Sequence, residues 1–331
     1  MILHPPVLAL IVAALISAGF VGWASLFAIR LLRHWNLASG SQTQIDLEKG
    51  AYLVAVILRF VMASELAALV LFVFNADRMA PMFVGAMCAV GAFNASVYGF
   101  PALGVKIALF FGAGLWLALD VVDGQGRDYP LTRLKYGALL ALAPLAFADA
   151  GLTLAYFLDL KADTLTSCCG KLFSAEKPTI ASEMAGLNPK VALLLLAAVS
   201  IVLPGVAAAA QRLPRAHGLY GVMSVVFFGV ALAAVVSAIS LYVYEHPHHH
   251  CPFCLLKREY HYFGFLLYAF LFAGTALGLA AGVIGSIPTP ASLQMIAPRA
   301  ARKLLTGSIV GFALFCAASA WAVISSKLVL M

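Results

Sequence analysis

Charge is scarce in this 331-residue chain: only 11% of its residues are Asp, Glu, Lys or Arg, whereas 63% are hydrophobic. The mean hydropathy of +0.98 is far from that of a soluble globular domain and indicates a polytopic membrane protein. No cation precedes the first apolar run, since the first one is Arg30, so we expect no cleavable signal peptide. Alternating polar and apolar strand patterning is absent, which argues against a β-barrel.

Several catalytic signatures are missing as well. There is no phosphate-binding loop, no H-E-x-x-H metalloprotease motif and no nucleophile elbow, so ATP-driven transport and hydrolysis lack support. The formal net charge of +7 comes mostly from cations that flank apolar runs. We therefore expect contact with membrane lipids and none with nucleic acid.

Long apolar runs dominate what is present. A helix needs about 20 apolar residues to cross a hydrocarbon core, and eight runs meet that length. They lie near residues 6–29, 51–74, 105–122, 136–158, 191–210, 218–243, 261–285 and 304–328. The prediction is an all-α, multi-pass helical bundle that forms one integral membrane domain over residues 1–331.

The distribution of loop cations predicts the orientation, because Lys and Arg accumulate on the cytoplasmic side. Four loops carry them: Arg30, Arg33 and Lys49; Arg127, Arg133 and Lys135; Arg212 and Arg215; Arg299, Arg302 and Lys303. All four loops share one side if segment 82–104, which is apolar but interrupted by Gly, Asn, Ser and Pro, is re-entrant or interfacial and does not cross. The N-terminus then lies outside an inner (cytoplasmic) membrane.

With that topology, two cysteine-bearing loops face outward. Loop 159–190 contains Cys168 and Cys169, and turn 244–260 contains the pair Cys251 and Cys254. In a bacterial-type cell this side is the periplasm, where disulfides persist. Of the remaining two cysteines, Cys88 is expected near the same level and Cys316 in mid-helix as a small apolar residue.

The C-x-x-C pair is the strongest functional signal. Two such thiols can form a disulfide, and the more exposed one often has a lowered pKa. If the next helix begins by Cys254, then Arg258 and His261 share its face with Cys254 and are positioned to orient a quinone carbonyl.

The string from Cys251 through Cys254 to Arg258 resembles the disulfide-bond-formation protein B family and the related vitamin K epoxide reductases. The resemblance implies a membrane thiol-disulfide oxidoreductase that passes electrons from an extracytoplasmic thiol or redox protein to a membrane quinone. Cys251 and Cys254 would be the quinone-proximal pair, Arg258 the quinone contact, and Cys168 with Cys169 the shuttle pair. This chain departs from those families in having more helices and adjacent shuttle cysteines.

A metal site is the alternative. Five of the eight histidines lie between residues 246 and 261, and sulfur with imidazole suits copper or zinc. The candidate ligands are His246, His248, His249, His250, Cys251 and Cys254. Such a module, holding copper, zinc or haem iron, would serve as a subunit of an electron-transfer or export complex with other membrane subunits. Disulfides that only brace the loops are a third possibility.

Ionisable residues also occur inside predicted spans, where an unpaired charge is costly. Glu65 and Asp149 are candidates for a proton relay toward the outer half of the membrane. Alternatively, Arg59 pairs with one of them, while Lys106 snorkels to the outer interface. Gly274, Gly278 and Gly282 recur every fourth residue, which predicts a close-packed helix face.

Overall fold

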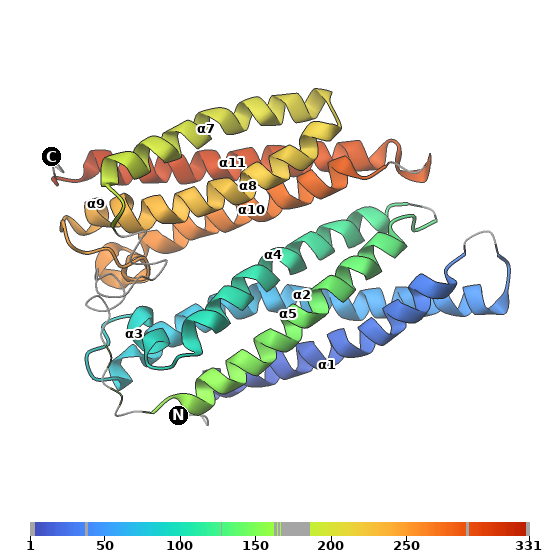
Figure 1. Cartoon of the computed structure of the whole chain (residues 1–331), viewed down its shortest axis with the longest axis horizontal. Coiled ribbons are helices and arrows are strands. Elements are labelled where there is room, and N and C mark those ends of the chain that lie inside the picture. Colours follow the sequence, from blue (N-terminus) through green and yellow to red (C-terminus); the bar gives the residue numbers. More distant parts are fainter. Residues whose placement is uncertain are drawn as a thin grey trace. The chain divides into compact units, whose positions relative to one another are not determined.

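The computed structural model describes residues 4–36, 39–126, 128–161, 164, 166, 186–288 and 291–328. These residues form helices and turns without a β-strand, and eight of the helical segments are long and apolar enough to cross a membrane (Figure 1). The eight segments coincide with the eight predicted ones. The protein is therefore an all-α, multi-pass integral membrane protein.

The chain divides into two compact units, and the expected single integral membrane domain over residues 1–331 stays a prediction. Unit 1 comprises Met1–Met79, Ala92–Thr164 and Pro288–Ala297. Unit 2 comprises Ala80–Gly91, Leu165–Ile287 and Pro298–Met331. Hydropathy could not reveal this division, because it reports how many helices cross and not which helices pack together.

Unit 1 is a bundle of four long helices. They are α1 (Pro5–His34), α2 (Gln42–Met79), α4 (Gly99–Asp123) and α5 (Thr132–Asp159). Each packs against two of the others, in the order α1, α2, α4, α5 and back to α1. The first turns of α2 extend beyond the apolar run, because hydrogen bonds between side chains four residues apart, such as Gln44 to Glu48 at 2.9 Å, support a polar helix.

Unit 2 contains the other four spanning segments. They are α7 (Pro189–Arg212), α8 (Arg215–Ala234) with its continuation through η2 (Val235–Ile239) and α9 (Ser240–Tyr244), α10 (Phe263–Ser286) and α11 (Ile296–Ser325). The element η2 is a π-helical turn, a form that often marks functional sites. Short 3-10 turns, η3 (Cys254–Leu256) and η4 (Arg258–Tyr260), precede α10, and η5 (Ala291–Leu293) precedes α11.

The glycine face predicted on α10 is confirmed. A Cβ added to Gly282 would lie 2.7 Å from the Gly221 Cα of α8, and one added to Gly278 would lie 2.2 Å from the Ser224 hydroxyl oxygen. On the other side, a Cβ on Gly311 of α11 would lie 3.0 Å from the Gly274 Cα. The absence of side chains lets three helix backbones approach closely, which is how membrane helices gain packing energy.

Segment 82–104 contains no helix of its own that is long enough to span. After η1 (Ala80–Met82) it forms the six-residue helix α3 (Ala89–Asn94), and its last residues already belong to α4. In Figure 1, α3 lies at the end of the unit 1 bundle where α4 begins. Entry of this segment into the membrane stays a prediction.

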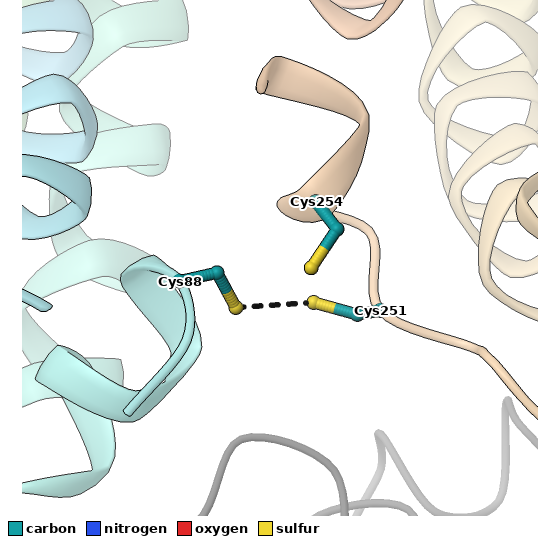
Figure 2. Close-up of side chains that lie close together, drawn as sticks. All are labelled: Cys88, Cys251 and Cys254. Atoms are coloured by element: carbon teal, nitrogen blue, oxygen red, sulfur yellow. Dashed lines mark hydrogen bonds between the residues drawn. The ribbon is translucent and has the colours of Figure 1, made fainter. Parts of the chain in front are cut away.

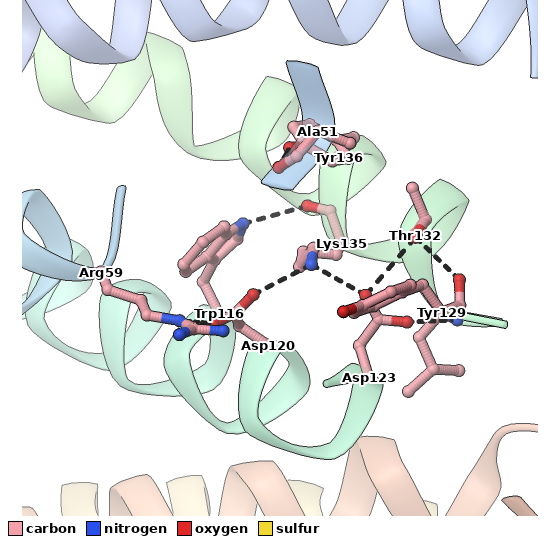
Figure 3. Close-up of polar contacts among 10 residues, drawn as sticks. Ala51, Arg59, Trp116, Asp120, Asp123, Tyr129, Thr132, Lys135 and Tyr136 are labelled. Carbon is pink, nitrogen blue, oxygen red and sulfur yellow. Dashed lines mark hydrogen bonds and ion pairs between the residues drawn. The ribbon is translucent and has the colours of Figure 1, made fainter. Parts of the chain in front are cut away.

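The charged residues of unit 1 are paired differently from our expectation (Figure 3). Arg59 donates to Asp120, and not to Glu65 or Asp149. Lys135 was expected among the loop cations, yet its Nζ is buried 2.9 Å from Asp120 Oδ1 and 2.8 Å from Asp123 Oδ2. These four residues form an ion-paired layer where the α4–α5 hairpin turns.

Lys106 is likewise not an interface residue. Its side chain is 2% exposed, and its Nζ lies 2.8 Å from Asp149 Oδ2. An ammonium inside a bundle is retained only when a carboxylate neutralises it, which explains why the side chain does not snorkel.

Candidate functional site

Three cysteine sulfurs converge in unit 2. Cys88, Cys251 and Cys254 have their Sγ atoms all within 4.8 Å of one another, and the Cys88 and Cys251 sulfurs are 3.4 Å apart (Figure 2). Cys88 and Cys251 are completely buried, and Cys254 is 6% exposed. A distance of 3.4 Å exceeds the S–S bond length of about 2.05 Å, so the contact is non-covalent. We call this group the cysteine triad.

Cys88 is brought to the triad by the loop that follows α2. Gly85 in this loop has a φ of +87°, and a Cβ there would lie 2.3 Å from the Thr166 carbonyl oxygen. Thr166 holds the loop from both sides of Cys88: its N–H donates to the Val84 carbonyl at 3.0 Å, and its hydroxyl donates to the Gly91 carbonyl at 2.9 Å. Only glycine fits such a backbone at this distance.

Cys251 and Cys254 are held by two tyrosines. The Tyr244 hydroxyl at the end of α9 donates to the Cys251 carbonyl, and the Tyr268 hydroxyl of α10 donates to the Pro252 carbonyl at 2.8 Å. The backbone then tightens into η3, which presents Cys254 one short turn after Cys251. The dithiol turn is therefore fixed to the two helices that flank it.

Lys257 connects the two segments that supply the triad. Its N–H donates to the Cys254 carbonyl at 3.0 Å, and its ammonium donates to the carbonyl of Met87, the residue before Cys88. A cation next to a cysteine favours the thiolate, which is the form that reacts and binds metals. Burial and, secondarily, the negative charge of Cys254 raise the pKa of the nearby Tyr260 phenol, so Tyr260 stays neutral.

The helix expected to begin by Cys254 is not formed there. Lys257 is extended (ψ 157°), His261 and Tyr262 have left-handed backbones, and α10 begins only at Phe263. Cys254, Arg258 and His261 therefore do not share one helical face, and Arg258 and His261 are exposed. His261 instead lines a pocket of about 470 Å³ together with Tyr244, Tyr260 and Trp321.

The histidines surround the dithiol turn without joining the triad among the residues that the structure describes. His246 and His248 are exposed, with ring centroids 6.2 Å apart, and His249 stacks on Tyr244 at 4.2 Å. His250 Nδ1 lies 3.0 Å from the Val236 carbonyl in η2. Since a carbonyl only accepts, the Nδ1 atom of His250 carries a proton in this contact.

The other two predicted site cysteines, Cys168 and Cys169, lie outside the described residues. Cys316 is in α11, where its sulfur lies 3.3 Å from the Ser200 hydroxyl, in agreement with a packing role. The triad member that the C-x-x-C pattern misses is Cys88. In the sequence, Cys88 is a lone cysteine in a loop that contains glycines, and Cys251 lies 163 residues away along the chain.

The triad fits a soft metal ion. Zinc bound tetrahedrally at Zn–S distances of about 2.3 Å separates its sulfurs by about 3.8 Å. The distances between sulfur atoms in the triad are of the same size, since one is 3.4 Å and all are within 4.8 Å. Three thiolates satisfy a soft Cu(I) ion, whereas tetrahedral zinc needs a fourth ligand.

Comparison with protein-family models, curated proteins and solved structures gave no match to this chain.

Proposed function

We propose that this protein binds one soft metal cation, Cu(I) or Zn(II), at the cysteine triad on the outer face of the membrane. The convergence of Cys88 with Cys251 and Cys254 carries the proposal. A dithiol alone serves redox exchange, metal binding or bracing equally well, and a third buried sulfur at coordination distance favours the metal.

The residues around the triad suit a site that retains its ion. Burial excludes water and competing ligands, and the Lys257 ammonium donates to the carbonyl of Met87, the residue before Cys88. The tyrosine hydrogen bonds fix the backbone of the dithiol turn, so the ligand geometry is set before binding.

Exposed histidines precede the dithiol in the same turn, residues 244–260. His246 and His248 are exposed and carry nitrogen donors for copper or zinc. An ion could first bind these imidazoles and then pass to the more strongly binding thiolates. In this scheme the protein holds or hands over the metal, as a membrane subunit of an electron-transfer or export complex.

A second candidate, quinone-linked thiol-disulfide exchange, is favoured by the 3.4 Å contact between Cys88 and Cys251. With a disulfide between Cys251 and Cys254, the Cys88 thiolate would attack Cys251 Sγ. A Cys88–Cys251 bond forms, and Cys254 leaves as the thiolate. Over a full cycle, a partner's dithiol becomes a disulfide while a quinone takes up the two electrons and two protons as a quinol.

Metal analysis combined with thiol alkylation separates the two candidates. The full chain is purified in mild detergent, reduced anaerobically, loaded with Cu(I) or Zn(II) and desalted. The metal proposal expects one ion per chain, lost in Cys88→Ser, Cys251→Ser and Cys254→Ser. Cys316→Ser is the matched control and keeps the ion, because Cys316 lies outside the triad.

Failure to retain either metal after loading would refute the metal proposal. If the same protein forms a disulfide on addition of a quinone, and Cys254→Ser traps a mixed disulfide with another protein, exchange becomes the function. A fully loaded Cys88→Ser variant would show that the triad is not the ligand set.

A further inference from the structure

Unit 1 contains a second cluster of chemically active groups, separate from the cysteine triad. Lys106 of α4 donates to Asp149 Oδ2 of α5 at 2.8 Å, and its ammonium lies 5.3 Å from the centroid of the Phe72 ring. Both charged side chains are almost completely buried, at 2% and 1% exposed. The pair lies well inside spanning helices, 7 residues from the start of α4 and 10 from the end of α5.

Glu65 of α2 adds a second carboxyl group to this cluster. It is 7% exposed, it accepts a hydrogen bond from Ser17 of α1, and it interacts electrostatically with Asp149 and Lys106. These are the polar and charged groups that face Glu65 from the three other helices of the bundle. The cluster therefore holds two carboxyl groups and one ammonium.

Unit 1 has two polar layers, the ion-paired layer at the α4–α5 turn and the cluster around Lys106. They differ in whether every carboxylate has a cation beside it. In the layer at the α4–α5 turn, Arg59 and Lys135 neutralise Asp120 and Asp123. In the cluster around Lys106, the single ammonium neutralises Asp149, and no second cation among the described residues pairs with Glu65. An uncompensated charge costs about 2.5–3.5 kcal/mol even on membrane-insertion scales, so a proton is the simplest way to remove it.

We propose that Glu65, Lys106 and Asp149 form an exchangeable proton-binding site in the membrane interior, with the proton on Glu65. Asp149 and Thr153 extend the site. Asp149 Oδ1 and the Thr153 hydroxyl are both buried and interact with each other, and neither has another hydrogen-bond partner among the described residues. They lie one turn apart on α5 and provide an acceptor and a donor for a proton that leaves Glu65.

A proton fits the site better than a metal cation. Hard cations bind about six or more oxygen ligands, and this cluster offers few. The Lys106 ammonium, 2.8 Å from Asp149, would also repel a second cation. On α2, Glu65 is six residues beyond Arg59, a rise of about 9 Å, so the same helix contributes to both polar layers of unit 1.

Infrared difference spectroscopy of the full chain in lipid tests the site, because a protonated carboxyl has its own carbonyl band. At neutral pH the wild-type protein should show one such band, which shifts in D₂O and disappears in Glu65→Gln. Asp149→Asn should abolish it too, since Lys106 then neutralises an ionised Glu65. Lys106→Met should give two bands, and Asp159→Asn, at the exposed end of α5, should change nothing.

Each variant is checked for a cooperative unfolding transition, and Glu65→Gln and Asp149→Asn, which conserve shape, decide the outcome. A band that persists in Asp149→Asn would overturn the charge-balance argument, because Glu65 would then be protonated by burial alone. A band that D₂O does not shift would overturn exchange with solvent. A band removed by Na⁺ at constant pH would assign the site to that cation and overturn the proton assignment.

Discussion

Replacement of Lys135 tests whether charge balance holds the α4–α5 hairpin of unit 1 together. Lys135 is 4% exposed and forms ion pairs with both Asp120 and Asp123. Lys135→Met keeps the apolar part of the side chain and removes only the ammonium. The Asp123 carboxylate then keeps its hydrogen bonds from the Leu131 N–H and the Thr132 hydroxyl but has no cation.

The expected loss follows from burial. Removing one partner of a buried ion pair costs about 3–5 kcal/mol, because the other charge is left uncompensated. At roughly 2 °C per kcal/mol for a chain of this size, the unfolding midpoint should fall by about 6–10 °C. The double variant Lys135→Met/Asp123→Asn is neutral again and should recover to within about 1–2 kcal/mol of wild type.

Thermal unfolding in detergent, at one scan rate for all variants, measures these shifts. Lys190→Met is the control: Lys190 is an exposed lysine in the first turn of α7, and its loss should change stability by less than about 0.5 kcal/mol. If the double variant is no more stable than Lys135→Met alone, uncompensated charge is not the cause of the loss, and the reasoning fails.

Three further predictions concern unit 2. Cys88→Ser should weaken metal binding about 10²–10³-fold, measured by competition with a chelator. A structural zinc site binds its ion with about 10–16 kcal/mol, which is about 2.5–4 kcal/mol for each of four ligands. A change below about threefold would contradict ligation by Cys88. Gly85→Ala should also lower the metal affinity in the same assay, although it removes no ligand. Its Cβ would clash with the Thr166 carbonyl and displace the loop that carries Cys88. Unchanged affinity would show that this loop does not position Cys88. Gly282→Val should lower the unfolding midpoint much more than Gly229→Val, whose Cβ would meet open space; equal shifts would contradict close packing of α8 on α10.

The structure differs from the sequence-based predictions where the partner of a residue is distant in the chain. Lys106 and Lys135 resemble interface cations in the sequence, since each lies near the end of an apolar run. Their carboxylates, Asp149 and Asp120, are 43 and 15 residues away and meet them only when α4 packs on α5. Likewise, α10 starts only at Phe263 because His261 and Tyr262 have left-handed backbone conformations. Neither residue type by itself predicts that a helix is interrupted there.

The sequence by itself determined the eight spanning helices of the described residues, the helical fold class and the glycine face of α10. Hydropathy over about 20 residues and a four-residue spacing are local properties, and the membrane requires that local backbone hydrogen bonds be satisfied within each helix. Only the tertiary structure decided that the helices form two units, that Arg59 pairs with Asp120, and that Cys88 joins Cys251 and Cys254. Those outcomes depend on which helices and loops pack together, and no local pattern specifies a contact across 163 residues.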